Sequence, residues 1–259
     1  MLHIHPLPAF EDNYIWVLRQ EDFDTCVVVD PGDEDPVIEY LQTQGLKLAG
    51  ILITHGHGDH TGGVRALKQR WPAAVIWGPA REPVPVVERP VAEGEEIDLA
   101  ALPFTCQVMD VPGHTKGHVA YRLGDILFCG DTLFAGGCGR VFSGTHEQLS
   151  NSLRRIAALP PQTRIYCAHE YTLANLGFAL WVEPDSPAIE TRRKTEEQKR
   201  QQGLSTVPST LALELDTNPF LRTGEPAVIS AAEKWAGRAL HGHHEVFHAL
   251  REWKDRDYD

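Results

Sequence analysis

The chain has 259 residues, of which 42% are hydrophobic and 23% are charged, and its formal net charge at pH 7 is −12. That length is enough for one large domain, or for a larger and a smaller one, with a buried core. The acidic balance argues against sequence-independent binding to nucleic acid, which requires a basic surface. No apolar run approaches the roughly 20 residues of a membrane span, so we expect neither a membrane nor a nucleic acid as a partner.

The N-terminal segment and the cysteines indicate the compartment. MLHIHPLPAFEDNY has neither the basic start nor the apolar core of a signal peptide, so we expect a cytoplasmic protein. Four of the five cysteines lie in apolar, strand-like runs, which predicts buried reduced thiols rather than a disulfide framework. Cys138 lies in the glycine-rich GGCGR, and we interpret it as structural because no histidine partner is evident nearby.

Residues 1–170 alternate strand-like and helix-like segments. In chain order, the expected strands are 13–19, 25–30, 47–54, 73–77, 104–111, 118–123, 125–128 and 163–168. The expected helices are 36–45, 63–71 and 146–160. The first two strands have the pattern of a hairpin, Gly45 closes the first helix, and the Pro160–Pro161 pair stops the last one. This alternation predicts an α/β domain.

The pattern changes from about Tyr171 onward. The expected helices are 172–182, 188–203, 226–237 and 243–254, with no convincing strand. We therefore predict a smaller, mostly α-helical second domain over residues 171–259. The charged run TRRKTEEQKR is interpreted as a solvated helix face, and the histidine-rich HGHHEVFH as a surface helix.

The stretch THGHGDHTGG, residues 54–63, places four metal-binding side chains directly after a buried strand. His55 and His57 can point the same way because they are two residues apart, while Asp59 and His60 can turn toward a second point. One metal ion does not easily use all four. Imidazole and carboxylate together suit Zn²⁺, Fe²⁺ and Mn²⁺. The two glycines between the ligands are expected to free the backbone for sharp turns.

Three more candidate ligands each follow an expected strand. They are His114 in VPGHTKGH, Asp131 in FCGDTLF and His169 in YCAHEYT. Loops at the strand ends of an α/β scaffold are where sites are usually built. Seven candidate ligands from four strand exits therefore predict a metal centre.

The order of these motifs resembles a known group of proteins. HxHxDH followed by His, Asp and His is similar to the metallo-β-lactamase superfamily, whose fold is an αββα sandwich with the metals at one edge. GDTLFAGGCGR, HEYTLAN, TVPSTL and NPFLR, with a helical C-terminal part, resemble the hydroxyacylglutathione hydrolase (glyoxalase II) family over nearly the whole chain. The resemblance implies a catalytic sandwich domain at 1–170 and a glutathione-binding helical domain at 171–259.

The resemblance also implies two divalent metal ions, which we expect to be zinc, with iron and manganese also compatible. The ligands carried over from the family are His55, His57 and His114 for one ion, Asp59, His60 and His169 for the other, and Asp131 as the bridge. Two cations about 3.5–4 Å apart can share an anionic bridge, which accounts for a carboxylate at position 131. Coordination lowers the pKa of water from about 15.7 to about 7, which makes hydroxide available at neutral pH.

The implied reaction is hydrolysis of S-(2-hydroxyacyl)glutathione thioesters. The chief substrate would be S-D-lactoylglutathione, giving D-lactate and glutathione in the second step of methylglyoxal detoxification. Metal-bridging hydroxide would attack the thioester carbonyl, with Asp59 and Asp131 as the catalytic carboxylates. The leaving thiolate needs no strong general acid, because the pKa of a thiol is about 8.5, and no obvious acid is found among the motifs.

The family holds glutathione with basic and tyrosine side chains, and the positions implied here are Arg140, Phe142, Tyr171, Arg251 and Lys254. Arg251 and Lys254 are one helical turn apart, so they can share a face. Phe142 departs from the pattern, since many members have tyrosine there. One hydroxyl contact is then missing, and we expect a lower affinity for glutathione.

Other functions fit parts of the pattern. A lactonase shares nearly all the ligands, so only the proposed glutathione-binding residues argue against it. A glutathione persulfide dioxygenase would use mononuclear iron with less of this C-terminal domain, and a β-lactamase generally lacks the full HxHxDH set with a bridging aspartate. A non-catalytic metal-binding module would usually have lost ligands. We expect a monomer whose partner is a small-molecule glutathione thioester.

Overall fold

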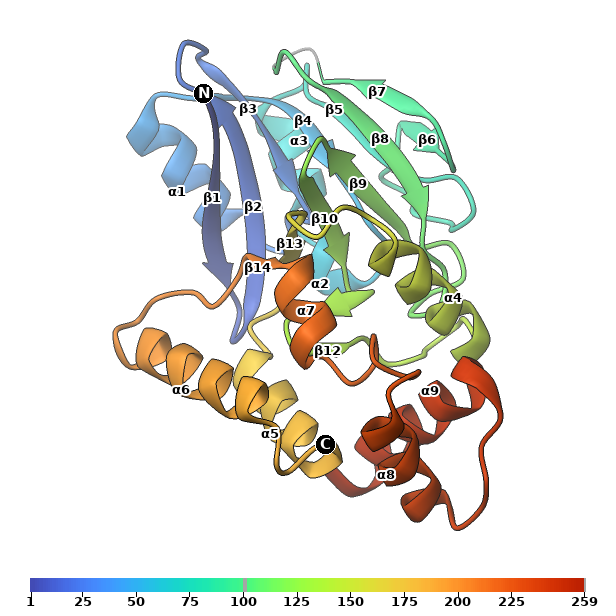
Figure 1. Ribbon diagram of the computed structural model, residues 1–259. Helices are drawn as coiled ribbons and strands as arrows, with labels where there is room; N and C mark the ends of the chain where they lie inside the picture. Colours follow the sequence, from blue (N-terminus) through green and yellow to red (C-terminus); the bar gives the residue numbers. More distant parts are fainter. Residues whose placement is uncertain (100–101, 259) are drawn as a thin grey trace. The chain divides into compact units, whose positions relative to one another are not determined.

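The computed structural model describes residues 1–99 and 102–258. The chain divides into two compact units, and Figure 1 labels most of their helices and strands. Unit 1 comprises Met1–Asp110 and Gly117–Gly130, and unit 2 comprises Val111–Lys116 and Asp131–Asp259. The four expected ligands of THGHGDHTGG therefore belong to unit 1, and His114, Asp131 and His169 belong to unit 2.

Within residues 1–99, unit 1 forms a six-stranded sheet whose strands follow chain order. They are β1 (Leu2–Ala9), β2 (Asn13–Gln20), β3 (Thr25–Val29), β4 (Lys47–Leu52), β5 (Val75–Pro79) and β6 (Arg89–Val91). β1 to β3 are antiparallel, which confirms the β2–β3 hairpin, and β3 to β6 are parallel. β1 was not expected, because Pro6 and Pro8 argue against a strand. At the edge of a sheet such prolines are tolerated, since an edge strand has one side without a ladder.

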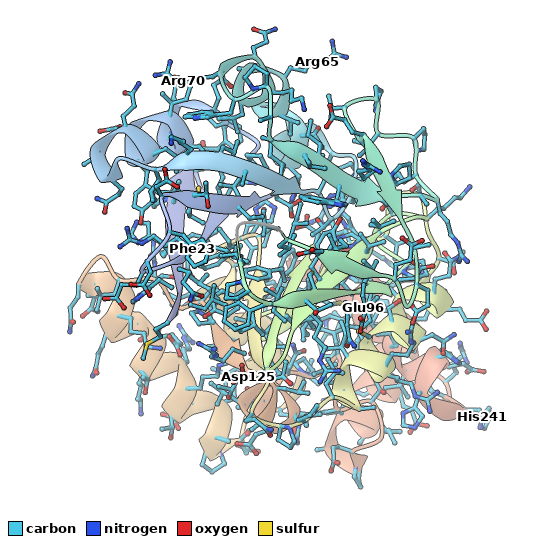
Figure 2. The ribbon with its side chains drawn as sticks, turned by 90° about the horizontal axis from the view of Figure 1, so that it is seen from above. Phe23, Arg65, Arg70, Glu96, Asp125 and His241 are labelled. Atoms are coloured by element: carbon cyan, nitrogen blue, oxygen red, sulfur yellow. The ribbon has the colours of Figure 1, made fainter. Side chains whose placement is uncertain are left out.

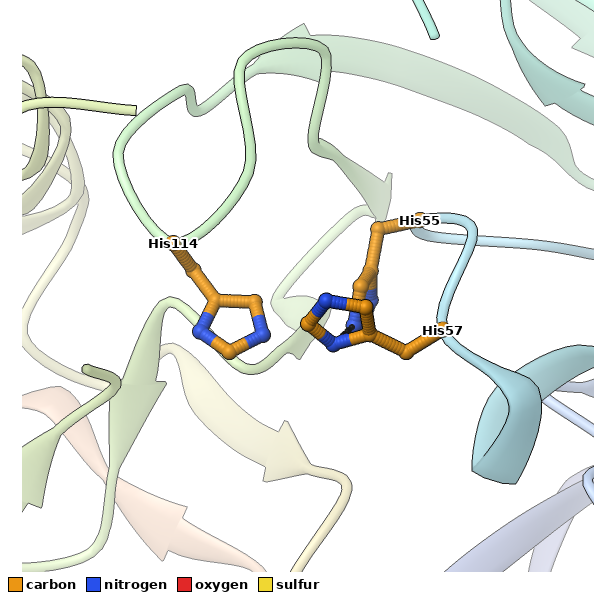
Figure 3. Close-up of side chains that lie close together, drawn as sticks. All are labelled: His55, His57 and His114. Atoms are coloured by element: carbon orange, nitrogen blue, oxygen red, sulfur yellow. Dashed lines mark hydrogen bonds between the residues drawn. The ribbon is translucent and has the colours of Figure 1, made fainter. Parts of the chain in front are cut away.

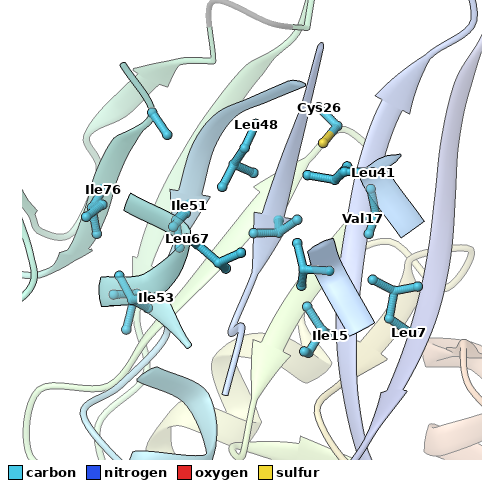
Figure 4. Close-up of a cluster of buried hydrophobic side chains, with 14 of the residues drawn as sticks. Leu7, Ile15, Val17, Cys26, Leu41, Leu48, Ile51, Ile53, Leu67 and Ile76 are labelled. Atoms are coloured by element: carbon cyan, nitrogen blue, oxygen red, sulfur yellow. The ribbon is translucent and has the colours of Figure 1, made fainter. Parts of the chain in front are cut away.

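Helices α1 (Asp35–Gln44) and α3 (Val64–Arg70) cover one face of this sheet. Figure 4 shows the resulting core, in which Leu41 of α1 and Leu67 of α3 pack on side chains of β1 to β5. α1 ends at Gly45 as expected, with a φ of 66° that glycine adopts without strain. In Figure 2, Arg65 and Arg70 of α3 extend away from this core. The packing fixes the C-terminal end of β4, where the ligand loop begins.

The other strands of unit 1 are β7 (Glu96–Asp98), β8 (Thr105–Asp110), β9 (Val119–Leu123) and β10 (Ile126–Gly130). They pair antiparallel in the order β10, β9, β8, β7. The buried hydroxyl of Tyr121 in β9 donates to the carbonyl of Ile53 at 2.7 Å, and the backbone N–H of Val119 donates to the carbonyl of Thr54 at 2.9 Å. These bonds hold the start of the ligand loop in place.

Unit 2 is mostly helical. Its helices are α4 (His146–Ala157), α5 (Thr172–Val182), α6 (Pro187–Gln201), α7 (Leu211–Thr217), α8 (Pro226–Ala236), α9 (Gly242–Trp253) and the π-helical η1 (Lys254–Tyr258). β11 (Leu133–Phe134) pairs with β12 (Gly137–Cys138), and β13 (Arg164–Cys167) pairs with β14 (Ser209–Thr210). β14 and α7 were not expected, because they are too short to give a periodic pattern. Among the described residues, no helix is long and apolar enough to cross a membrane.

A buried ion pair corrects the interpretation of the charged run in α6. Arg192 is buried, and its guanidinium donates to the hydroxyl of Thr217 at 2.6 Å and to a carboxylate oxygen of Glu214 at 2.5 Å. The other oxygen of Glu214 accepts from the backbone N–H of Gly136 at 2.8 Å. The run is therefore not wholly solvated, since one of its arginines anchors the turn between β11 and β12.

The five cysteines are free and buried, as the sequence predicted. Burial raises the pKa of the Cys138 thiol to about 11, although Arg251 opposes this shift. A thiol with so high a pKa carries little thiolate at neutral pH. Cys138 is therefore structural rather than reactive.

Candidate metal centre

The four expected ligands of unit 1 leave β4 in a tight loop. His55 is fully buried, and its Nε2 lies 3.0 Å from Nδ1 of His57. The short helix α2 (Gly58–Thr61) then carries Asp59 and His60, and Nε2 of the buried His60 lies 3.4 Å from a carboxylate oxygen of Asp59. The loop thus places its ligand atoms in two pairs.

The glycines of the loop do not have the role that was expected. Neither Gly56 nor Gly58 has a positive φ, so neither supplies a turn that only glycine can make. Glycine is instead needed where two backbone segments pass closely. A Cβ atom at Gly32 would collide with the carbonyl oxygen of Asp59, and one at Gly62 would lie 2.5 Å from the carbonyl oxygen of Gly32. The loop is therefore held by close backbone packing.

Buried side-chain oxygens face the Nδ1 atoms of two of these imidazoles, those of His55 and His60. Asp30, which follows β3, accepts hydrogen bonds from the backbone N–H and the hydroxyl of Thr54 at 2.8 and 2.7 Å. Its Oδ2 also lies 3.1 Å from Nδ1 of His60. The hydroxyl of Thr54 lies 3.1 Å from Nδ1 of His55. Because Nδ1 of both rings faces a protein oxygen, Nε2 is the ring nitrogen of each that could bind a metal ion.

Asn13 performs a similar role for Asp59. It begins β2 and is buried, and its amide Nδ2 donates to a carboxylate oxygen of Asp59 at 3.1 Å. The Asp59 side chain is itself 41% exposed. The hydrogen bond therefore restricts a side chain that solvent would otherwise leave mobile.

The ligands of unit 2 are arranged around a carboxylate. One oxygen of Asp131 lies 3.5 Å from Nε2 of His114, and its other oxygen lies 3.4 Å from Nε2 of His169. All three side chains are buried. Nδ1 of His114 lies 2.8 Å from the backbone carbonyl of Arg140, which fixes Nε2 as the inward atom of that ring. Asp131 thus presents one carboxylate oxygen to each of two imidazoles.

The side chains that offer ligand atoms form three groups. They are His55, His57 and His114; His55, His60 and Asp131; and Asp59, His60 and His169. Within each group the ligand atoms lie within 4.8 Å of one another, and Figure 3 shows the three imidazoles of the first group. Imidazole nitrogens with carboxylate oxygens are the donors that zinc, iron and manganese accept. The residues present therefore fit a divalent metal centre.

Two of the expected substrate-binding residues face inward. Arg251 is fully buried and donates from Nη1 to the carbonyl of Cys138 at 3.0 Å, while its guanidinium lies 5.2 Å from the centroid of the Phe220 ring. Lys254 is also buried, with Nζ 5.7 Å from the centroid of the Tyr258 ring. Neither residue belongs to a solvated helix face.

The other three expected substrate-binding residues adjoin histidines of the ligand set. The Phe142 ring is 65% exposed and meets the His114 ring edge to face at 5.1 Å. The Tyr171 ring stacks on the His169 ring at 4.8 Å with an interplanar angle of 4°. The backbone carbonyl of Arg140 lies beside His114. The side chain of Arg140 is 51% exposed. Exposed aromatic rings thus contact two of the candidate ligands of unit 2.

Asp30 and Asn13 contact the candidate ligands and were not predicted from the sequence. Asp30 ends the run VVVD, so it had the same strand-exit position that singled out Asp131. It was passed over because no histidine stands beside it in the sequence. Asn13 carries no such signal, since one amide at the start of a strand is common and its partner lies 46 residues away.

Two family models match successive parts of the chain. The sequence-family model of the metallo-beta-lactamase superfamily matches residues 10–169. The family model of the hydroxyacylglutathione hydrolase C-terminus matches residues 170–257. The hydroxyacylglutathione hydrolase of Alkalilimnicola ehrlichii is 52% identical over 256 residues, which cover 99% of this chain and 100% of that relative. The chain belongs to the hydroxyacylglutathione hydrolase family. A further member, from Ectopseudomonas mendocina, is 50% identical over 99% of this chain and 100% of its own length.

Solved structures support the fold of this hydroxyacylglutathione hydrolase family member. ETHE1 from Myxococcus xanthus covers 100% of this chain and 93% of its own, with a TM-score of 0.68 and 22% identity. TTHA1623 in a di-iron-bound form covers 85% of this chain and 100% of its own, with a TM-score of 0.59 and 26% identity. The predicted metallo-β-lactamase fold with a helical C-terminal part is thus confirmed.

Proposed function

We propose that this protein hydrolyses S-(2-hydroxyacyl)glutathione thioesters, chiefly S-D-lactoylglutathione, to the 2-hydroxy acid and glutathione. The observation that carries the proposal is sequence identity of 50% and 52%, over 99% of the chain, to relatives named hydroxyacylglutathione hydrolase. The C-terminal region discriminates best between possible substrates, because other hydrolases of the superfamily have the same sandwich fold. The family-specific match at residues 170–257 favours a glutathione thioester over a lactone or a β-lactam.

For the metal centre we propose two divalent ions, zinc by preference, with iron and manganese also compatible. The proposed ligands are His55, His57 and His114 for one ion, Asp59, His60 and His169 for the other, and Asp131 between them. The three groups of ligand atoms within 4.8 Å support this assignment. When bound, such ions polarise a carbonyl oxygen and make a coordinated water acidic enough to ionise near pH 7.

The protein's own groups would orient these components. Asp131 presents one oxygen to each of two imidazoles, and Asn13 restrains the Asp59 carboxylate. Both carboxylates are therefore held before the substrate arrives, which lowers the reorganisation needed during reaction. Departure of the thiolate requires no protonated side chain, because the pKa of a thiol is about 8.5.

We propose that residues 171–259, with the loop after β12, bind the glutathione moiety. The proposed residues are Arg140, Phe142, Tyr171, Arg251 and Lys254. The rings of Phe142 and Tyr171 contact ligand histidines, and the backbone of Arg140 does so through its carbonyl, which supports contact with a substrate whose thioester lies at the metals. The cationic residues provide local positive charge for an anionic substrate on a chain of net charge −12. We also propose a monomer in the cytoplasm, with residues 1–170 as the catalytic domain.

A substrate comparison tests this proposal. Purified protein would be assayed with S-D-lactoylglutathione, an acyl homoserine lactone and a β-lactam at equal concentrations. We expect hydrolysis of the thioester with a kcat/KM at least about a hundredfold above that of the other two, since unmet polar contacts in a binding site cost several kcal/mol. Hydrolysis of the lactone alone would overturn the proposal.

A further inference from the structure

Three charged side chains of unit 2 converge among the proposed glutathione-binding residues. Oδ1 of Asp255, in η1, accepts hydrogen bonds from Nη2 and Nε of Arg251 at 2.8 and 3.2 Å. The same oxygen lies 3.4 Å from Nε of Arg140, which belongs to the loop after β12. One carboxylate oxygen therefore contacts two guanidinium groups from distant parts of the chain.

The two arginines differ in exposure. Arg251 is fully buried, and its bond to the carbonyl of Cys138 ties it to the segment that leads into Arg140. The side chain of Arg140 is 51% exposed, so it is the one of the pair that an incoming anion meets from solvent. Arg251 and Asp255 form the inner part of the cluster, and Arg140 forms its outer part.

We propose that Asp255 is a positioning residue, which through its Oδ1 holds the guanidinium of Arg140 in the orientation that receives a carboxylate of the glutathione moiety. This inference rests on the proposed function. A guanidinium binds a carboxylate best when its planar fork is presented in a fixed orientation, because the bidentate pair is directional. Fixing Nε of Arg140 on Asp255 sets the plane of that fork before the substrate binds.

If Asp255 acted only through its charge, its removal would change KM in the direction opposite to that expected for a positioning residue. Asp255 carries a negative charge beside two arginines, so its removal raises the local positive potential and should strengthen the attraction of an anionic substrate. If Asp255 acts only through its charge, neutralisation lowers KM. If it positions Arg140, neutralisation raises KM.

The test uses Asp255→Asn, which keeps the size and one acceptor oxygen, with Asp257→Asn as the matched control. Asp257 is also in η1, and its carboxylate accepts a hydrogen bond from Trp235 rather than from an arginine. With S-D-lactoylglutathione we expect Asp255→Asn to raise KM about five- to twentyfold, as for a weakened charged hydrogen bond, with kcat within about twofold. The control should leave both constants unchanged. Asp255→Glu should restore part of the loss.

A double-mutant cycle separates positioning from a general disturbance of the fold. In an Arg140→Ala background, Asp255→Asn should not raise KM further, because the side chain that it positions is gone. A further rise in KM there, or an unchanged or lower KM in the single variant, would overturn the inference. If the wild-type protein does not hydrolyse the thioester at all, it is the proposed function that fails.

Discussion

Three of the proposed histidine ligands turn their outer ring nitrogen toward a protein oxygen. Nδ1 of His55 faces the hydroxyl of Thr54, that of His60 faces Asp30, and that of His114 faces the carbonyl of Arg140. Such partners fix the ring and its tautomer, and they raise the basicity of the metal-binding nitrogen. Metal affinity should therefore depend on residues that do not touch the metal.

Asp30→Asn tests this dependence. Asparagine keeps the shape of the side chain but lacks the negative charge that faces His60, so we expect metal affinity to fall about 10–100-fold. Competition with a chromophoric chelator measures the change. Asp24→Asn is the control, because the exposed Asp24 pairs with Lys47 on the surface. Equal affinities in the two variants, with unchanged unfolding temperatures of the metal-free proteins, would contradict the prediction.

Phe142 offers a second test at single-residue scale. Its exposed ring meets His114, and a tyrosine there would add one hydroxyl toward the substrate. We expect Phe142→Tyr to lower KM for S-D-lactoylglutathione about two- to tenfold, as for one added hydrogen bond. Phe23→Tyr, in the exposed connection between β2 and β3, should leave KM unchanged. An unchanged KM in Phe142→Tyr would show that position 142 does not contact the substrate.

Helices α4 and α9 contact each other through two histidine rings. The rings of His146 in α4 and His248 in α9 stack at 4.3 Å with an interplanar angle of 27°. Burial, and then the charge of His248, lower the pKa of His146, while Asp255 and Glu252 oppose the shift. A protonated pair would repel across this contact, so α9 should be held less firmly in acid.

The sign of the pH dependence follows from that shift. Because the pKa of His146 is lower in the folded protein, the unfolded chain takes up its proton first as pH falls, and stability is lost from about pH 6.5 downward. We expect His146→Gln to reduce the fall in unfolding temperature between about pH 7 and pH 5. His5, whose pKa is also lowered, contributes equally in both proteins. Parallel curves for the two proteins would rule out a role for His146.

Elements with a long periodic pattern were predicted correctly, and short or edge elements were not. The helix at 36–45 and the buried strand at 47–54 have clear apolar periods, and both appear as α1 and β4. β1 was hidden by its prolines, and β14 has two residues. In α6, the burial of Arg192 depends on Glu214, a partner 22 residues away that no local pattern indicates.

Across the whole molecule, the candidate ligands could be named from the sequence, but the residues that surround them could not. His55, His57, Asp59 and His60 stand in one short motif, so the sequence alone indicated a metal. Two of their partners come from other strands, because Asp30 follows β3 and Asn13 begins β2. The burial of Arg251 was equally hidden, because it depends on Asp255 and on the carbonyl of Cys138. Sequence motifs thus predict which residues are candidate ligands, and tertiary contacts decide how those side chains are oriented.

Hydrolysis of a glutathione thioester at a metal-dependent site can be tested on a single sample. The rate of S-D-lactoylglutathione hydrolysis and the metal content per chain would be determined on the same purified sample, before and after chelation. We predict turnover with two metal ions per chain, loss of both on chelation and recovery of both when zinc is restored. Undiminished turnover in a metal-free sample, or no turnover in a sample with two ions per chain, would show that the protein is not a metal-dependent thioesterase.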